Sequence, residues 1–208
     1  MYLWVHDGEA EIRPADELWG LETGPARQVI VESTHPQSSV ALIGPAGENG
    51  VRYASIQADL RFAAGRDGMG AVMGAKRLKA LAVHGNQQPQ AANPEQLRQV
   101  SRTVLQEFRT DEASAPLSVF GTWLALRGLT NSGILPVHNF RGGEPQGIAR
   151  LDSQAVKDAI QKKRETCARC SIVCRPVVDL HGPVTVSPDY GGPEYETAAA
   201  PGSLLDNF

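Results

Sequence analysis

The three cysteines of this 208-residue chain all lie within eight residues, in the run Cys167-Ala168-Arg169-Cys170-Ser171-Ile172-Val173-Cys174. A disulfide-stabilised secreted protein spreads an even number of cysteines along its length, so this pattern argues against a disulfide framework. The C-x-x-C-x-x-x-C spacing lets three thiolates converge on one face of an iron–sulfur cluster, with a fourth ligand supplied from elsewhere. Zinc, with His181 as a further ligand, and unliganded thiols are the alternatives, although zinc ribbons normally use two C-x-x-C pairs.

The overall composition excludes several classes of protein. A hydrophobic fraction of 41% is enough to bury a core, and the net charge of −3 lacks the basic character of a nucleic-acid-binding protein. No apolar run of eighteen residues is present, and the first residues lack the basic and apolar regions of a signal peptide. We therefore expect a cytoplasmic protein with no nucleic-acid partner and no membrane partner.

The first ninety residues are predicted to be β-rich. Short β-prone runs alternate with turn dipeptides such as Gly44-Pro45 and Asn49-Gly50. The expected strands cover residues 28–32, 40–43, 53–56 and 78–83. A polar segment at residues 85–90 is typical of a linker.

The remainder of the chain is predicted to be helical and rich in loops. Asn93 is a suitable N-cap and Pro94 a suitable first helical residue. They are followed by apolar residues at helical spacing, namely Leu97, Val100, Val104 and Phe108. Further helices are expected over residues 117–126 and from residue 152 or 153 to the cysteines. The predicted fold class is α+β, with a β-rich part (residues 1–90) followed by an all-α, loop-rich domain (residues 91–208).

A glycine-rich segment at residues 65–76 is the second candidate site. Glycines at positions 65, 68, 70 and 74 permit a tight turn and close approach of the backbone to a ligand. The short helix expected next would present free N–H groups to a phosphate, and Arg66 and Lys76 would add positive charge. The segment matches neither the dinucleotide-binding fingerprint nor the phosphate-binding loop. The structural alternative is a glycine turn that allows close packing of a helix.

Two glutamates at residues 191–197 form the third candidate site. Glu194 and Glu196 follow a rigid glycine-rich turn, about twenty residues after the last cysteine. A carboxyl group there could transfer protons if burial raised its pKa. The alternative is that both are surface or helix-capping residues. His138, in a loop, is interpreted as a structural residue.

Together these segments resemble the aldehyde ferredoxin oxidoreductase family of tungsten- or molybdenum-dependent enzymes. Five stretches carry the resemblance in the order that the family has them, at residues 43–49, 65–76, 131–140, 167–174 and 192–197. The match is to the middle of longer family members, so the resemblance implies a central fragment. The β-rich part would be an incomplete pterin-binding domain and the helical part an incomplete iron–sulfur domain.

The resemblance also implies a role for each candidate residue. Cys167, Cys170 and Cys174 match three ligands of a 4Fe–4S cluster, and Glu194, with Glu196 the weaker match, corresponds to a glutamate that handles protons near the metal. A bis-pterin cofactor carrying tungsten or molybdenum would be held by the turn formed by Arg66, Asp67, Gly68, Met69 and Gly70.

The implied reaction is the oxidation of an aldehyde to a carboxylic acid. Electrons would pass from the metal through the pterin and the cluster to ferredoxin, while the protein anchors the cofactor. A homodimer or a complementing chain is an expected partner. The alternative functions are an iron–sulfur electron-transfer subunit without substrate chemistry, or an inactive truncated remnant.

Overall fold

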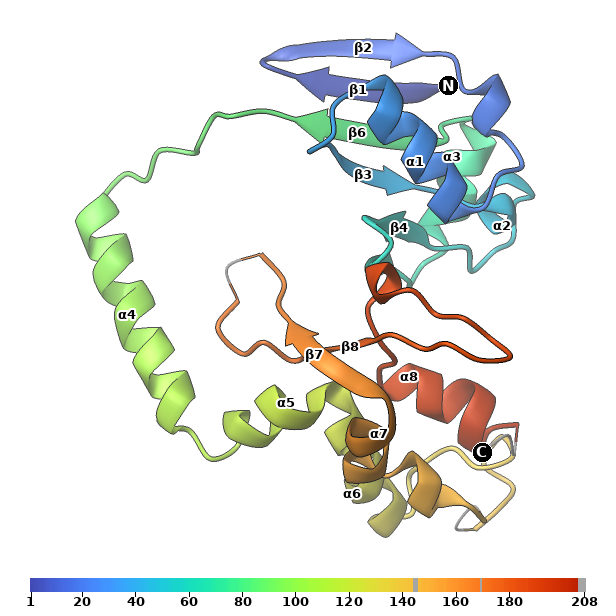
Figure 1. Cartoon of the computed structure of the whole chain (residues 1–208), viewed down its shortest axis with the longest axis vertical. Coiled ribbons are helices and arrows are strands. Elements are labelled where there is room, and N and C mark those ends of the chain that lie inside the picture. The colour runs from blue at the N-terminus through green and yellow to red at the C-terminus, as the bar shows by residue number, and fades with distance from the viewer. Residues whose placement is uncertain (144–145, 169, 206–208) are drawn as a thin grey trace. The chain divides into compact units, whose positions relative to one another are not determined.

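The computed structural model describes residues 1–143, 146–168 and 170–205. The chain divides into two compact units, Met1–Gln90 and Ala91–Phe208 (Figure 1). In the described ranges, no helix combines the length and the apolar character needed to cross a membrane.

The first unit is built on a six-stranded sheet with strand order β2-β1-β6-β3-β4-β5. Strands β1 and β6 run parallel, and every other neighbouring pair is antiparallel. The strands are β1 (Tyr2–His6), β2 (Glu9–Arg13), β3 (Ser39–Leu42), β4 (Ile56–Ala58), β5 (Phe62–Ala64) and β6 (Ala80–His84). The segments between the strands contain the 3-10 helix η1 (Asp16–Leu18) and the helices α1 (Thr23–Ser33), α2 (Pro45–Glu48) and α3 (Met69–Ala75).

Helix α1 covers one face of this sheet and closes the core (Figure 1). Ala26 and Ile30 of α1 are fully buried, and they share one core with Trp4 of β1 and Ala82 of β6. The prediction of a strand over residues 28–32 is wrong, because this segment lies inside α1. Its β-branched residues favour a strand only weakly, whereas a helix places Ala26 and Ile30, four residues apart, on the same buried face.

Of the other three strands expected in this unit, two are confirmed and one is largely wrong. Strands over residues 40–43 and 78–83 are confirmed by β3 and β6. The strand over residues 53–56 is wrong except at Ile56, because Ala54 N–H donates to the carbonyl of Val51 in a turn.

The second unit consists of short helices and one two-stranded sheet. Its core contains Trp123, Leu126, Leu135, Val137 and Ala198. In chain order the elements are α4 (Pro94–Thr110), α5 (Ser114–Phe120), η2 (Gly121–Leu124), α6 (Ala125–Asn131), η3 (Ile148–Leu151), α7 (Ser153–Ile160), β7 (Gln161–Glu165), β8 (Arg175–Val178), η4 (Pro188–Tyr190), α8 (Tyr195–Thr197) and the π-helix η5 (Ala198–Ser203).

Helix α4 confirms the sequence prediction. The Asn93 side chain accepts a hydrogen bond of 3.0 Å from Gln96 N–H, and Pro94 is the first helical residue. The apolar residues expected on one face of the helix are all partly exposed, and none of the residues of α4 is fully buried. The helix expected over residues 117–126 is broken at Gly121, whose φ of 65° ends α5.

The helix expected to run from residue 153 to the cysteines instead ends at Ile160. The chain continues directly into β7, which pairs antiparallel with β8, and the cysteines lie between these two strands. The α+β class is confirmed, with a sheet-rich first part and helices following, but the hairpin means that the second unit is not purely α-helical.

Candidate functional site

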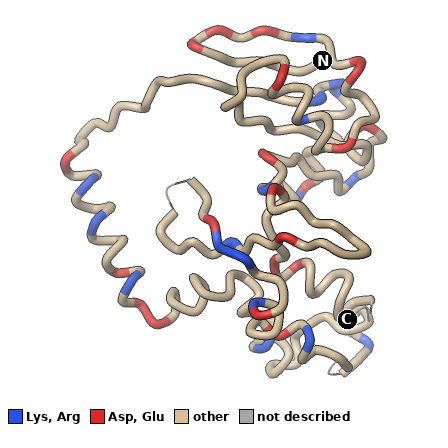
Figure 2. Tube along the Cα trace, viewed as in Figure 1, with Lys and Arg blue, Asp and Glu red and all other residues tan. Residues whose placement is uncertain are grey.

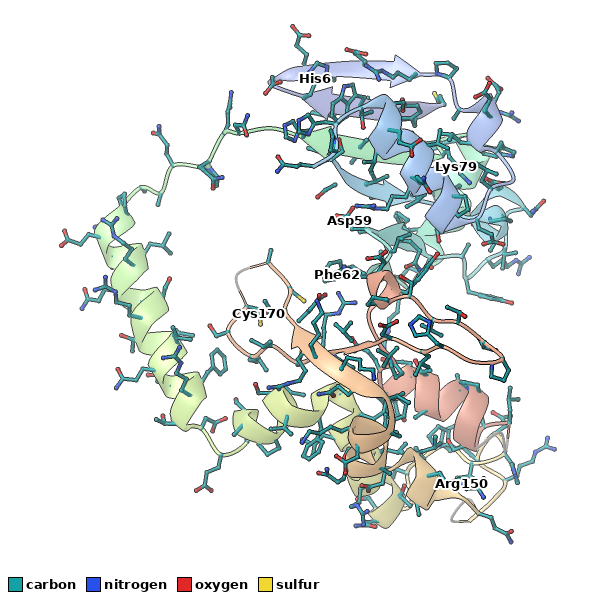
Figure 3. All side chains as sticks on the ribbon, viewed as in Figure 1. His6, Asp59, Phe62, Lys79, Arg150 and Cys170 are labelled. Atoms are coloured by element: carbon teal, nitrogen blue, oxygen red, sulfur yellow. The ribbon has the colours of Figure 1, made fainter. Side chains whose placement is uncertain are left out.

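All three cysteines lie on the connection between β7 and β8, residues 166–174, which we call the thiol loop; Arg169 lies outside the described residues. Cys170 is labelled on this loop in Figure 3. The thiols form no disulfide; Cys167 is exposed, while Cys170 and Cys174 are half-buried. The Thr166 hydroxyl donates to the carbonyls of Cys167 (3.1 Å) and Cys170 (2.6 Å), which ties the first part of the loop together.

The end of the thiol loop is held by a close backbone contact with η2. Gly121 has a φ of 65°, and a Cβ at this position would lie 2.4 Å from the carbonyl oxygen of Cys174. Only glycine permits this approach. The residue before Cys174 is Val173, which has a φ of 57°, an uncommon conformation for a β-branched residue.

The glycine turn at residues 191–192 packs against β8 in the same way. A Cβ at Gly192 would lie 2.7 Å from the carbonyl oxygen of Pro176, and Val178 N–H donates to the Gly191 carbonyl at 3.2 Å. This contact holds the residues after Gly192 next to β8, the strand that directly follows the thiol loop. As a result Glu194 lies near the loop.

The Glu194 carboxylate is positioned by two side chains from other elements. The Thr122 hydroxyl donates to Glu194 Oε2 at 3.1 Å, and the same hydroxyl accepts from Tyr195 N–H at 3.0 Å. Arg175 Nε lies 3.9 Å from Glu194 Oε1. Glu194 is also the N-cap residue of α8. It therefore caps a helix, as the alternative interpretation expects, and at the same time lies near the thiol loop.

The electrostatics connect Glu194 with Cys174. Burial raises the pKa of the Cys174 thiol, and the negative charge of Glu194 raises it further, with smaller contributions from Cys167 and Cys170. Glu196 is exposed, and its charge adds to the effect of burial in raising the pKa of Tyr195. Of the two predicted glutamates, Glu194 is therefore the one whose charge acts on Cys174.

In the first unit, the predicted glycine turn packs α3 backbone to backbone against α2 and against the segment 52–55 that follows it. A Cβ at Gly68 would lie 1.9 Å from the Arg52 carbonyl oxygen, and one at Gly70 would lie 2.5 Å from that of Ser55. At Gly74 a Cβ would lie 1.9 Å from the carbonyl oxygen of Gly47 in α2. These contacts account for the three glycines without a ligand, as the structural alternative predicts.

The other residues of the turn face solvent. Arg66, Asp67 and Met69 are exposed, and Asp67 has a φ of 68°. In the part of the chain that the structure describes, the Arg66 guanidinium makes no hydrogen bond or ion pair. The turn therefore combines a rigid glycine base with an exposed cation that is available to an anionic ligand.

Sequence reasoning missed Thr122 and Arg175 because their role depends on contacts between distant segments. Thr122 and Glu194 are separated by 72 residues, and nothing in the sequence around Thr122 marks it. Gly121, which admits the Cys174 carbonyl, was likewise indistinguishable from an ordinary helix-ending glycine.

The donor set of the thiol loop fits part of a metal site. Three unpaired thiols on one loop match the thiolate ligands that iron–sulfur clusters take. Among the described residues, however, no three side chains of His, Cys, Asp or Glu are gathered closely enough to hold a metal ion. His181, the residue considered for zinc, is exposed and pairs with Asp179 at 3.0 Å.

Comparison with known families covers nearly the whole chain. Residues 1–85 match the aldehyde ferredoxin oxidoreductase N-terminal domain, and residues 99–208 match domains 2 and 3 of aldehyde ferredoxin oxidoreductase. The chain belongs to the aldehyde ferredoxin oxidoreductase family.

Individual relatives of the aldehyde ferredoxin oxidoreductase family agree with this assignment. A tungsten-containing aldehyde ferredoxin oxidoreductase of Pyrococcus abyssi is 34% identical over 212 residues, covering 99% of this chain and 33% of the relative. The WOR-like subunit of an aliphatic sulfonate oxidoreductase of Pyrococcus furiosus is 30% identical over 159 residues, covering 70% of this chain and 24% of the relative.

A solved structure shows the same fold. The active-site complex BamBC of benzoyl coenzyme A reductase, in complex with 1,5-dienoyl-CoA, superposes with a TM-score of 0.77 at 25% identity, covering 99% of this chain and 33% of that one. The chain thus spans about a third of the length of the aldehyde ferredoxin oxidoreductases that it matches.

Proposed function

We propose that this chain forms part of an oxidoreductase that oxidises an aldehyde to a carboxylic acid at a tungsten- or molybdenum-bis-pterin centre. Electrons would leave through a 4Fe–4S cluster to ferredoxin. The observation that carries the proposal is the position of Glu194, whose Oε1 lies 3.9 Å from Nε of Arg175, the residue that follows Cys174. This position puts a carboxylate at the end of the thiol loop in a chain of this family. The proposed location is the cytoplasm, where thiols stay reduced.

Cys167, Cys170 and Cys174 would hold the cluster, with a fourth ligand from elsewhere. The cluster supplies one-electron transfer when bound. Because the ligands are thiolates, the raised pKa of Cys174 opposes ligation by the free thiol, and a bound metal must overcome this by favouring the deprotonated form. The loop contacts of Thr166 and Gly121 hold the backbone on either side of the thiols.

The glycine turn would anchor the phosphates of the pterin cofactor. Arg66 is exposed and suited to bidentate contact with phosphate, while Gly68 and Gly70 allow the rigid packing behind it. Asp67 and Met69 are exposed on the same turn and would contact the cofactor through backbone and side chain.

An aldehyde and a water molecule give a carboxylic acid, two protons and two electrons. Glu194 would accept one of these protons and pass it on, with Glu196 the second candidate. The Thr122 hydroxyl fixes one carboxylate oxygen of Glu194, and the Arg175 guanidinium lies near the other. Positioning of this kind is what a general acid or base requires.

The test is elemental analysis of the chain purified without oxygen, for iron, sulfide, tungsten, molybdenum and zinc. We expect iron, sulfide and one of the two heavier metals, together with aldehyde-dependent reduction of a viologen dye. An aliphatic sulfonate serves as the competing substrate, since one relative is named for it. Zinc alone, or iron without tungsten or molybdenum, would overturn the proposal; the second result would favour an electron-transfer subunit.

Two variants test which residues bind the cluster and which bind the pterin cofactor. Cys170→Ser should remove most of the iron, because it deletes one thiolate, whereas Ser171→Ala on the same loop should leave the iron content unchanged. Arg66→Ala should lower the content of pterin and tungsten but spare iron. Equal loss of both metals in Arg66→Ala would show general misfolding and no specific role for the guanidinium.

A further inference from the structure

The longest run of consecutive basic residues in this chain lies on β7, immediately before the thiol loop. It reads Lys162-Lys163-Arg164, in a sequence whose net charge is −3. Figure 2 shows this basic strand in blue. Arg164 is half-buried and donates to Ser118 Oγ at 3.3 Å, so it is bound within the fold. Lys162 and Lys163 are exposed, and we call this pair the lysine edge.

Strand pairing leaves the lysine edge open to a partner. Among the described residues β7 pairs only with β8, so the other side of β7 is an unpaired strand edge. The register passes from Gln161↔Val178 to Lys163↔Val177, which leaves Lys162 outside the ladder as a bulge. Bulges redirect side chains and occur next to functional sites.

The two lysines are electrostatically available. Within the described residues Lys162 makes no ion pair. Lys163 Nζ lies 3.0 Å from Glu165 Oε1, but the Lys163 side chain is 63% exposed. Because the Lys163 ammonium group is largely in solvent, its pairing with Glu165 contributes at most about 1 kcal/mol, and the ammonium group remains accessible to a carboxylate of a partner.

The lysine edge must also lie close to the thiols, because few residues separate the two in the sequence. Lys163 and Cys167 are four residues apart, so their Cα atoms are separated by at most about 14 Å. For Lys162 and Cys167 the limit is about 18 Å. A protein bound to these ammonium groups would therefore lie beside the loop that carries the proposed cluster.

We propose that the lysine edge is the docking surface for an acidic protein electron carrier of the ferredoxin class. This inference rests on the proposed function, because a docked carrier needs a cluster in the thiol loop to exchange electrons with. Complementary charge steers encounters and raises association rates by about 10- to 1,000-fold at low salt. The competing explanation is that lysines on a strand edge only prevent aggregation.

The experiment measures the association rate of the purified chain with an immobilised acidic 4Fe–4S ferredoxin, without oxygen, at 50 mM and 1 M salt. Lys162→Glu/Lys163→Glu should lower the rate at least tenfold at 50 mM salt. The difference should largely disappear at 1 M, where the Debye length is about 3 Å. Lys162→Gln/Lys163→Gln should give a smaller loss of rate and serves as the variant least able to disturb folding.

The matched control is Arg98→Glu/Arg102→Glu, which makes the same change in charge on exposed residues of α4. Equal losses of rate in both double variants, or none in the lysine variants, would overturn the docking surface. Iron content and viologen reduction are measured on the same samples. If the lysine variants lose ferredoxin association but keep their iron, the lysine edge acts in docking and not in cluster binding. If no sample contains iron, the proposed function is refuted, and the docking surface is then supported or refuted by the association rates alone.

Discussion

The two units of this chain are stabilised in different ways. The first has a continuous core between α1 and the sheet, together with an ion pair between Lys79 and Glu48 whose side chains are 0% and 4% exposed. The second has a smaller core, and its longest helix, α4, has no fully buried residue. Its candidate site is instead arranged by backbone contacts of Gly121 with Cys174 and of Gly192 with Pro176 at the start of β8. Side-chain burial thus closes the core of the first unit, and backbone contacts at Gly68, Gly70 and Gly74 add to it. In the second unit, backbone contacts arrange the candidate site.

The largest expected effect comes from breaking the buried ion pair of the first unit (Lys79 is labelled in Figure 3). Lys79 Nζ also donates to the Leu21 carbonyl at 3.0 Å, and Glu48 Oε2 accepts from Gly20 N–H at 2.8 Å. Lys79→Ala should therefore lower the free energy of unfolding by about 3–5 kcal/mol, because it leaves a buried carboxylate unpaired. Urea unfolding followed by tryptophan fluorescence would measure it.

The control for this prediction is the exposed Lys76→Ala, which should change stability by less than about 0.5 kcal/mol. The double variant Lys79→Met/Glu48→Met should recover much of the loss, since it removes both charges together. A Lys79→Ala protein as stable as the wild type would contradict the view that this pair supports the first unit.

A second expected effect tests whether backbone packing also matters in the first unit. Gly74→Ala would place a methyl group 1.9 Å from the Gly47 carbonyl oxygen, so α2 and α3 would have to separate. We expect a loss of about 1–3 kcal/mol or more in the free energy of unfolding. If thermal melting of Gly74→Ala matches the wild type, the close contact between α2 and α3 does not constrain this unit.

Some elements were predictable because their signals are local. Asn93 and Pro94 mark the start of α4, and the apolar spacing that follows gives its length. The strand prediction for residues 28–32 failed because only the tertiary packing of Ala26 and Ile30 decides between helix and strand there. The helix expected to reach the cysteines ends at Ile160 because β7 gains a partner, β8, that periodicity within one segment does not reveal.

The candidate site likewise has residues that the sequence identifies and residues that only the fold reveals. The spacing of Cys167, Cys170 and Cys174 is visible in the sequence, whereas Glu194 was selected only by the resemblance to the family. Thr122 positions Glu194 through a hydrogen bond between residues far apart in the chain, which leaves no local pattern. The reason for the glycines at 68, 70 and 74 is likewise a contact with α2 and its neighbours, and only the fold shows it.

A smaller effect is expected at the thiol loop of the metal-free, reduced chain. Burial and the charge of Glu194 raise the pKa of Cys174, so at pH 8 a smaller fraction of this thiol is thiolate and alkylation is slower than at exposed Cys167. Glu194→Gln removes the negative charge, lowers that pKa and should speed alkylation of Cys174 several-fold, shifting its pH profile to lower pH. Mass spectrometry of iodoacetamide-treated protein would measure each site.

The matched control for the Cys174 experiment is Glu196→Gln, two residues further along the chain. Its carboxylate is exposed and does not contribute to the pKa of Cys174, so the alkylation rate should not change. Equal acceleration by Glu194→Gln and Glu196→Gln would refute the specific pairing of Glu194 with the thiol loop.

The smallest expected effect distinguishes the glycines of the second unit that shape the site from those that do not. Gly128 lies within α6, and a Cβ there would meet no atom within 4 Å. Gly128→Ala should raise the free energy of unfolding by about 0.5–1 kcal/mol, because alanine loses less backbone entropy in a helix. Gly121→Ala should lower it, since its Cβ would lie 2.4 Å from the Cys174 carbonyl oxygen. If both variants shift the thermal melting temperature in the same direction, backbone contact at Cys174 is not what holds the thiol loop in place.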